Sequence, residues 1–415
     1  MQYHPTPEHI VSIIKNHIPK KYDSFLDPSV GEGALLYALG EKIDNKKLTL
    51  IDLDISKINK VRLNYPDSEL IHADFIDWRT ENEDRNYDLI IANPPFLAKS
   101  KELIDFRGRK VPIELAFIKL CVESLSDCGK LIAIVPSSLI NSQIGLSLRV
   151  DLLKSGFLKY IYELPVNTFS RIEATFYIIV YDKSTKDIKN TVVRSLNFFN
   201  EDLLINTGDI NHYRFDYSFI KSKAFYDNLI NEFSRRSFRE YNLNEVSSIK
   251  RGIIKHSYND DSNIHSTALR NDIGLIQENY NQEYSFNNSS ICLKRVSRKS
   301  NYSFSLIENS LIPNCTDCLF IISIKNIDIL KAIFSLRALY SNISGESLLL
   351  KGSGAQYISI RDLREIRFVD LSLAYRDYFL EYRKCLLDHD YLNCTKIENK
   401  IFFSLLSKHN PSIIK

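Results

Sequence analysis

The sequence predicts an α/β fold: a mostly parallel sheet in the N-terminal half of the chain, followed by a mixed α+β domain. Between residues 5 and 185, short apolar runs alternate with helix-like patterns, which is the order of βαβ units. After residue 183 the chain changes to short mixed segments rich in Asn, Ser, Tyr and Lys. Its 415 residues are too many for one ordinary domain and suit two.

Seven apolar runs are expected to form the strands of the sheet. They cover residues 24–27, 48–51, 69–73, 88–92, 130–136, 159–164 and 174–181. Helical patterns between them cover about 32–40, 55–65, 113–127 and 145–155. Because no helical pattern separates the last two runs, we expect a closing hairpin whose final strand is antiparallel.

The change in composition sets the predicted domain boundaries. Residues 1–190 form the first domain, 191–244 a connecting region and 245–415 the second domain, with helical patterns at about 325–341 and 370–407. The second domain has 22 Lys and Arg against 18 Asp and Glu, whereas the rest of the chain has 32 against 33. This distribution allows phosphate contacts by the second domain without requiring them.

Bulk composition excludes several classes of protein. With 44% hydrophobic and 25% charged residues, the chain has the profile of a folded protein with substantial cores. It has no run of 18 apolar residues and no basic-then-apolar leader, so we expect a cytoplasmic protein without a membrane partner. The seven cysteines lack framework spacing, and Cys315 and Cys318 have no second pair at zinc-finger distance, so no metal is expected.

Glycines and acidic residues follow three consecutive predicted strands. The first strand leads into a glycine turn, where backbone amides can approach a ligand closely and a helix N-terminus favours polar groups. The acid after the second strand is placed to bind both hydroxyls of a ribose, and the third strand offers a carboxylate and a ring for an adenine. The residues of this predicted cofactor site are Asp27, Pro28, Ser29, Gly31, Gly33, Asp52, Leu53, Asp74 and Phe75.

The fourth predicted strand ends in the tetrapeptide Asn93-Pro94-Pro95-Phe96. An arbitrary Pro-Pro pair is most often a rigid turn, but here it follows a cofactor-type sheet. The Asn93 side-chain oxygen and the Pro94 carbonyl can accept both hydrogens of an amino group whose lone pair is delocalised into a base. Phe96 can stack on that base, and Phe169 is a candidate for a second aromatic wall, although it could equally be a core residue.

These motifs resemble the amino-methylating DNA adenine methyltransferases whose cofactor motifs come first and whose target recognition domain comes last, with TaqI-type enzymes nearest in plan. His4-Pro5-Thr6-Pro7-Glu8 looks like the N-terminal cofactor-covering motif of that family, so Thr6 and Pro7 join the predicted cofactor site. Residues 27–33 resemble its D-P-x-x-G-x-G motif, Asp52 its ribose acid and residues 93–96 its N-P-P-[YF] motif. Phe96 stands where Tyr is commoner in the family, and its ring can still stack on a base although it lacks the hydroxyl.

The resemblance implies a Rossmann-like, seven-stranded methyltransferase sheet that binds S-adenosyl-L-methionine as its cofactor. It implies transfer of a methyl group to N6 of an adenine that has swung out of duplex DNA. It also implies that residues 1–190 are the catalytic domain and 245–415 the target recognition domain, of restriction–modification type. No nuclease motif is evident, so any cognate endonuclease is expected to be a separate chain. We expect the protein to be a monomer.

Candidate DNA contacts lie in the second domain, whose opening and closing segments resemble specificity domains of restriction–modification systems only in outline. Basic and amide side chains suit phosphates and base edges, although charged loops are often simply solvated. The candidates are Arg251, Lys294, Arg295, Arg298, Lys299, Lys351 and Gln356.

The motifs leave other functions open. The same tetrapeptide could bind an adenine in RNA or a glutamine amide in a protein. The family resemblance implies that cytosine N4 in DNA is less favoured, because Asn rather than Ser begins the tetrapeptide. The alternative outside enzymology is a catalytically inactive DNA-binding scaffold, which predicts damaged motifs, and the sequence contains none.

Overall fold

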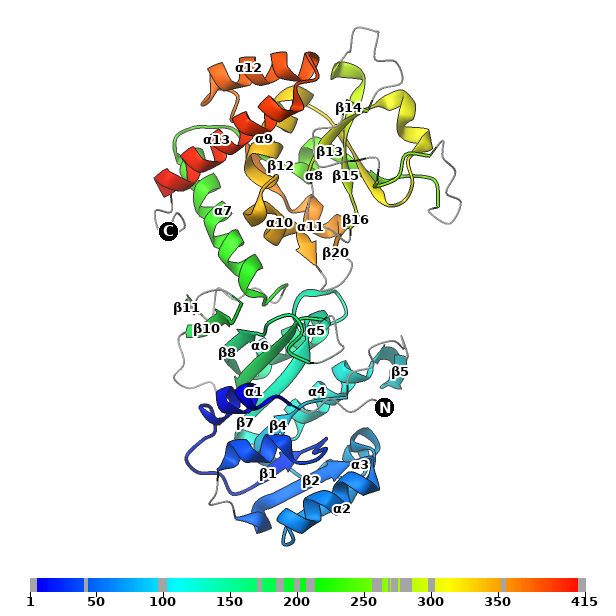
Figure 1. The fold of residues 1–415 in the computed structure, drawn as a ribbon, viewed down its shortest axis with the longest axis vertical. Helices are drawn as coiled ribbons and strands as arrows, with labels where there is room; N and C mark the ends of the chain where they lie inside the picture. The colour runs from blue at the N-terminus through cyan, green and yellow to red at the C-terminus, as the bar shows by residue number, and fades with distance from the viewer. Residues whose placement is uncertain are drawn as a thin grey trace. The chain divides into compact units, whose positions relative to one another are not determined.

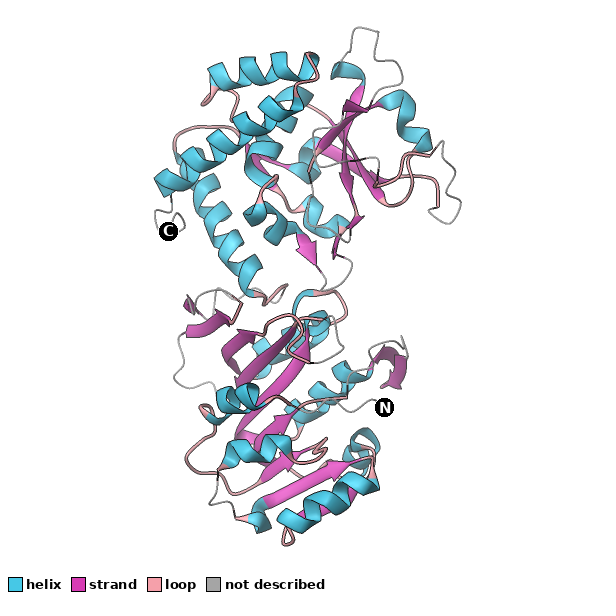
Figure 2. Cartoon of the chain, viewed as in Figure 1, coloured by secondary structure: helices cyan, strands magenta, loops and turns pink. Residues whose placement is uncertain are grey.

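The protein is described by a computed structural model that divides into two compact units, Met1–Tyr217 and Ser218–Lys415. The structure describes residues 6–40, 44–95, 103–169, 174–183, 190–197, 202–206, 213–255, 263–267, 269, 275–276, 286–297, 303–351 and 356–409. Each unit has its own arrangement of helices and strands, drawn in Figures 1 and 2.

A sheet of nine strands forms the centre of the first unit, in the order β11-β10-β8-β9-β7-β4-β1-β2-β3. The strands are β1 (Phe25–Asp27), β2 (Leu48–Asp52), β3 (Glu69–His72), β4 (Tyr87–Ala92), β7 (Leu125–Pro136), β8 (Phe157–Glu163), β9 (Phe176–Asp182), β10 (Asn190–Ser195) and β11 (Asp202–Asn206). The helices are α1 (Glu8–Lys15), η1 (Ala34–Leu39), η2 (Asn45–Lys47), α2 (Ile55–Asn64), α3 (Phe75–Glu81), α4 (Ile113–Glu123), α5 (Ser137–Asn141) and α6 (Leu146–Ser155). A separate hairpin, β5 (Leu103–Phe106) with β6 (Arg109–Pro112), precedes α4.

The pairing of the strands is mostly parallel, as predicted. Strands β3, β2, β1, β4 and β7 run parallel to one another, and β9 lies between β7 and β8 and is antiparallel to both. All seven predicted strands are present, and the expected antiparallel final strand is β9. The predicted count of seven is wrong, because β10 pairs parallel to β8 and β11 pairs antiparallel to β10. These two short strands follow a polar stretch that looks like the end of a domain.

Two predicted helices differ in extent from those observed. The first begins as a 3₁₀ helix at Ala34, directly after Gly33, whose φ of +84° suits the left-handed turn. The helix predicted to reach residue 127 ends at Glu123, and β7 starts at Leu125, earlier than predicted. A long apolar run does not distinguish a buried helix from a buried strand, so the boundary between them was misplaced.

The border between the units lies at Tyr217, so the predicted connecting region 191–244 is divided between them. Its first part contains β10 and β11 of the sheet. Its last part contains most of α7 (Tyr217–Arg235), whose apolar side chains Tyr226, Leu229 and Ile230 belong to the core of the second unit. The border at Tyr217 thus falls inside the predicted connecting region, and the amphipathic helix α7 packs on the second unit.

The second unit mixes short sheets with helices. Its strands are β12 (Glu240–Asn242), β13 (Ser247–Arg251), β14 (Leu275–Ile276), β15 (Ser289–Lys294), β16 (Val296–Ser297), β17 (Ser305–Glu308), β18 (Leu319–Ile324), β19 (Leu350–Lys351), β20 (Gln356–Ile358) and β21 (Arg367–Val369). They form sheets of five strands (β13-β18-β15-β17-β14), three strands (β16-β20-β19) and two strands (β12-β21). Besides α7, the helices are α8 (Leu243–Val246), α9 (Ile329–Tyr340), α10 (Ile343–Leu349), α11 (Ile360–Arg364), α12 (Arg376–Leu387) and α13 (Tyr391–His409), with η5 (Phe286–Asn288) and η6 (Asn309–Asn314).

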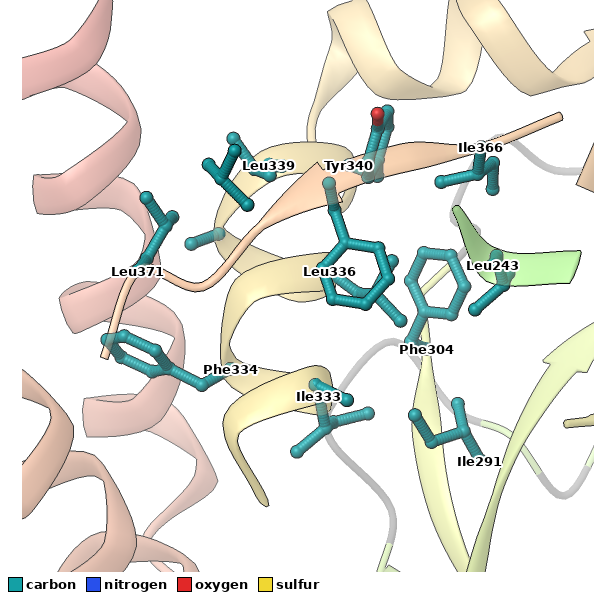
Figure 3. Packing of buried hydrophobic residues seen from close by; sticks show 14 of the residues in the cluster. Leu243, Ile291, Phe304, Ile333, Phe334, Leu336, Leu339, Tyr340, Ile366 and Leu371 are labelled. Atoms are coloured by element: carbon teal, nitrogen blue, oxygen red, sulfur yellow. The ribbon is translucent and has the colours of Figure 1, made fainter. Parts of the chain in front are cut away.

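The core of this unit gathers around α9, in which every residue except Lys331 is buried. Ile333, Phe334 and Leu336 of this helix face apolar side chains from the surrounding strands and helices (Figure 3). The helical pattern at 370–407 is interrupted: α12 ends at Leu387 and α13 starts at Tyr391, with a left-handed residue, His389, between them. In the described part of the chain, no helix combines the length and apolar character needed to cross a membrane.

Candidate cofactor and base-binding site

A cavity of about 420 Å³ lies in the first unit, where strands β1, β2, β3 and β4 end. This is the carboxyl edge of the parallel strands, where open α/β sheets bind ligands, and the volume is that of a small-molecule site. The predicted site residues that line it are Thr6, Pro28, Ser29, Gly31, Asp52, Leu53, Asp74, Phe75, Asn93, Pro94 and Pro95. The structure therefore brings most of the predicted site together.

The glycine turn after β1 is tied to the acid after β2. Gly31 adopts a φ of +57°, which an L side chain rarely takes, and its N–H donates to Asp52 Oδ2 at 2.8 Å. Asp52 Oδ1 accepts from the N–H of Asp54 at 2.9 Å, and Lys57 Nζ lies 3.7 Å from the same oxygen. These bonds fix the Asp52 carboxylate at the edge of the cavity, oriented before any ligand arrives.

Asp27 differs from the other predicted acids because it does not line the cavity, although the next residue, Pro28, does. Its side chain is fully buried; Oδ1 accepts from the Ser29 N–H at 3.1 Å, while Oδ2 has no hydrogen-bond partner in the described part of the chain. Burial raises the pKa of this carboxyl to about 8, and the nearby Asp52 adds to the rise. In this structure Asp27 holds the start of the glycine turn through the Ser29 amide.

The third strand supplies a carboxylate and a ring, as predicted. Asp74 caps helix α3, with Oδ1 accepting from the Ile76 N–H at 2.8 Å. Phe75 packs against Phe117 of α4, with ring centroids 4.7 Å apart, and both rings line the cavity. The wall is therefore apolar on the side of α4 and polar along the strand ends.

Asn93 is held from two directions. Its amide Nδ2 donates to Thr6 Oγ1 at 3.0 Å, and its backbone carbonyl accepts from Ser29 Oγ at 3.0 Å. Its amide oxygen Oδ1 is shielded from solvent and bonds to none of the residues that the structure describes. A buried acceptor without a donor is costly, by about 1–3 kcal/mol, so such an atom in a cavity wall indicates a bond that a ligand completes.

Besides Asp27, three residues of the prediction that the structure describes do not line the cavity: Pro7, Gly33 and Phe169. Pro7 precedes helix α1, and Gly33, with its positive φ, starts η1. Phe96 lies outside the described residues. Phe169 was proposed as an aromatic wall, and this is wrong: its ring is 1% exposed and packs edge-on against Phe176 in the core, with centroids 4.8 Å apart.

Several residues that line the cavity were not predicted. Lys57, His72, Ile113 and Phe117 come from α2, the end of β3 and α4. None belongs to a motif, and the apolar pattern of α4 is typical of an ordinary core helix. Only the packing of α4 over the strand ends reveals that its first turn forms part of the wall.

The predicted DNA contacts in the second unit differ in how far their side chains are exposed and in what they bind. Lys351 is 5% exposed and forms an ion pair with Asp362 at 2.8 Å, so the prediction that it contacts a phosphate is wrong. Arg295 Nε donates to the backbone carbonyl of Asp317 at 2.7 Å, an internal bond. Arg251 is exposed at the end of β13, whereas Lys294 and Gln356 are half-buried, and burial lowers the pKa of Lys294. Arg298 and Lys299 lie outside the described residues.

The cysteine pair is part of a core. Cys315 and Cys318 are buried, and burial raises the pKa of both thiols. Cys315 packs in an apolar cluster with Leu319 and Ile321. Among the described residues, no three His, Cys, Asp or Glu side chains gather as metal ligands.

Comparison with known proteins identifies the first unit. Residues 2–207 match the model of the N-6 DNA Methylase family, a range that covers the nine-stranded sheet from α1 to β11. The first unit belongs to this family. The match confirms the family that the motifs predicted, and the family implies S-adenosylmethionine as the cofactor.

Two curated relatives are similar to parts of the chain. The rRNA N(6)-adenosine-methyltransferase Mettl5 of Drosophila melanogaster is 23% identical over 125 residues, which cover 28% of this chain and 59% of that protein. The type II restriction enzyme and methyltransferase RM.BcgI of Heyndrickxia coagulans is 26% identical over 215 residues, which cover 46% of this chain and 33% of that protein. The chain thus spans less than two thirds of the length of either relative.

Solved structures are similar at low identity. The type IIG restriction endonuclease BpuSI has a TM-score of 0.46 and 12% identity, covering 99% of this chain and 66% of that one. The M protein of the type I restriction enzyme EcoKI has a TM-score of 0.38 and 17% identity, covering 47% of this chain and 48% of that one.

Proposed function

We propose that this chain is an S-adenosylmethionine-dependent DNA methyltransferase that modifies the N6 amino group of adenine, as the modification component of a restriction–modification or defence system. Family membership supports the reaction class. The observation that carries the assignment to an amino group is the Asn93 amide oxygen, an acceptor without a donor in the cavity wall. The relative RM.BcgI, by its name a restriction enzyme and methyltransferase, supports the biological setting.

The residues around the cavity fit the cofactor. Asp52, held by the Gly31 and Asp54 amides, suits the two hydroxyls of a ribose, and Asp74 and Phe75 suit an adenine ring. The glycine turn leaves room for the amino-acid end of the molecule. When bound, S-adenosylmethionine supplies a methyl group on a positively charged sulfur, which keeps the bonding electron pair as the methyl group leaves.

The chain's own residues activate the amino group. Asn93 Oδ1 and the Pro94 carbonyl accept its two hydrogens, which draws the nitrogen toward tetrahedral geometry and frees its lone pair for attack. After the transfer the positively charged nitrogen loses one of these two protons to water. Because Oδ1 is shielded in this structure, entry of a base has to displace the atoms that cover it. An adenine inside a duplex cannot reach this turn, so it has to swing out of the helix at a cost of a few kcal/mol.

The second unit is proposed to read the DNA sequence. Arg251 is the exposed cation among the predicted contacts that the structure describes, and Lys294 and Gln356 remain candidates at the ends of β15 and β20. A unit of this size beside a methylase domain suits a long polymer substrate. Its recognition role rests on these positions and on the outline resemblance to specificity domains.

RNA adenine is the second candidate substrate, because the relative Mettl5 is named as an rRNA N(6)-adenosine-methyltransferase. One experiment separates the two: the purified chain is incubated with radiolabelled S-adenosylmethionine and with unmethylated duplex DNA or total RNA. We expect label in N6-methyladenine of the DNA. Label in RNA alone would replace the proposal by the second candidate, and label in neither would overturn both.

A further inference from the structure

Thr6 lines the cavity and also forms a hydrogen bond with the side-chain amide of Asn93. The Asn93 side chain has two different ends, an NH₂ group that donates hydrogen bonds and an oxygen that accepts them. The structure pairs the NH₂ end with Thr6 Oγ1 at 3.0 Å and leaves the oxygen end without a partner among the described residues. The amide is therefore satisfied at one end only.

We propose that Thr6 is a positioning residue that holds the Asn93 side chain with its amide oxygen available to the substrate, an inference that rests on the proposed function. An amide that presents its oxygen binds an amino group, whereas an amide turned by 180° presents NH₂ and binds a keto group instead. A threonine hydroxyl can accept or donate, so it anchors the amide at either end; in this structure it accepts from the NH₂ group, which leaves the oxygen for the adenine amino group.

Other contacts fix the backbone of Asn93, so only its side chain remains free to rotate. Ser29 Oγ donates to the Asn93 carbonyl at 3.0 Å, and Pro94 and Pro95 restrict the chain that follows. Thr6 itself stands at the start of the segment that leads into α1, directly before Pro7. The N-terminal segment thus contributes to the base-binding turn, although its motif suggested contact with the cofactor alone.

The role of Thr6 predicts a separation between turnover and cofactor binding. In Thr6→Val the hydroxyl is replaced by a methyl group of similar size, so Asn93 Nδ2 loses its acceptor. We expect kcat for methylation of long unmethylated duplex DNA to fall about tenfold. The Kd for S-adenosylmethionine, measured by calorimetry, should stay within twofold, and Thr6→Ser should keep at least half of the wild-type kcat.

Thr80→Val is the matched control, because the Thr80 hydroxyl bonds only to the backbone of its own helix, at Ile76, outside the cavity wall. It should leave kcat unchanged. A weaker Kd that accounts for the whole loss in Thr6→Val would make Thr6 a cofactor ligand and overturn the proposal. A Thr6→Val variant with wild-type kcat, or a folded Thr6→Ser variant with low kcat, would also overturn it. Absence of DNA methylation by the wild-type chain would instead refute the proposed function.

Discussion

The wall of the cavity in the first unit and the core around α9 in the second unit surround their buried polar groups differently. In the first unit, Asn93 Oδ1 in the cavity wall and Asp27 Oδ2, next to Pro28 of that wall, are buried without partners in the described residues. In the second unit, Arg337 forms a bidentate ion pair with Glu398, at 2.6 and 3.0 Å, and Lys351 pairs with Asp362. Incomplete hydrogen bonding near a cavity points to a ligand, whereas complete pairing inside a core points to structure.

The largest expected effect concerns the unpaired oxygen. Asn93→Ala should lower kcat by about a thousandfold, because it removes an interaction made with the reacting amino group. Cofactor binding should remain within twofold, since the bonds of Asp52 and Gly31 are untouched. Single-turnover methylation and calorimetry measure the two quantities. An Asn93→Ala variant with full turnover would show that Asn93 takes no part in the mechanism and that its unpaired oxygen does not mark a ligand-binding position.

The second prediction concerns the buried pair of the other unit. Glu398→Ala leaves the Arg337 guanidinium buried without its counter-charge, which should cost about 3–5 kcal/mol of unfolding free energy. Urea unfolding followed by fluorescence measures the loss. Glu232→Ala, which breaks an exposed pair with Arg236, should change stability by less than about 1 kcal/mol. Equal effects of the two variants would show that burial of the pair is unimportant.

The third prediction concerns the pH dependence of stability. Because burial raises the pKa of Asp27 to about 8 in the folded chain, the folded state holds this proton more tightly than the unfolded state does. Stability should therefore fall as the pH rises from about 4 toward 8. Asp27→Asn, which is uncharged throughout, should flatten this slope in urea unfolding between pH 5 and pH 8. A slope as steep as that of the wild type would assign the pH dependence to other groups.

The smallest expected effect separates an exposed cation from a buried one. Arg251→Ala should weaken DNA binding and reduce the slope of log K against log salt by about one, as expected for one lost phosphate contact. Lys351→Met should leave that slope unchanged, because the Lys351 ammonium is paired with Asp362 inside the unit. Salt titrations of binding to duplex DNA measure both slopes. A lower slope in Lys351→Met would return this lysine to the DNA interface.

The site residues of the first unit were predictable from the motifs because the position of a strand end in a parallel sheet follows from the strand order. Parallel strands end at one edge of the sheet, so Gly31, Asp52, Asp74 and Asn93, each following its own strand, had to meet there. No such rule places a charge in the second unit, where Lys351 looked like a phosphate ligand and is a buried partner of Asp362. A charge in an irregular region shows its role only through its neighbours.

The sequence by itself determined the parallel sheet, the family and the strand-end residues of the cavity, because periodicity of two and of 3.6 and the punctuation of glycine and proline are local properties. Tertiary structure alone decided that β10 and β11 extend the sheet, that Phe169 belongs to the core and that Thr6 holds the Asn93 amide. Each of these depends on residues distant in the chain, whose contacts are formed only when the whole unit packs.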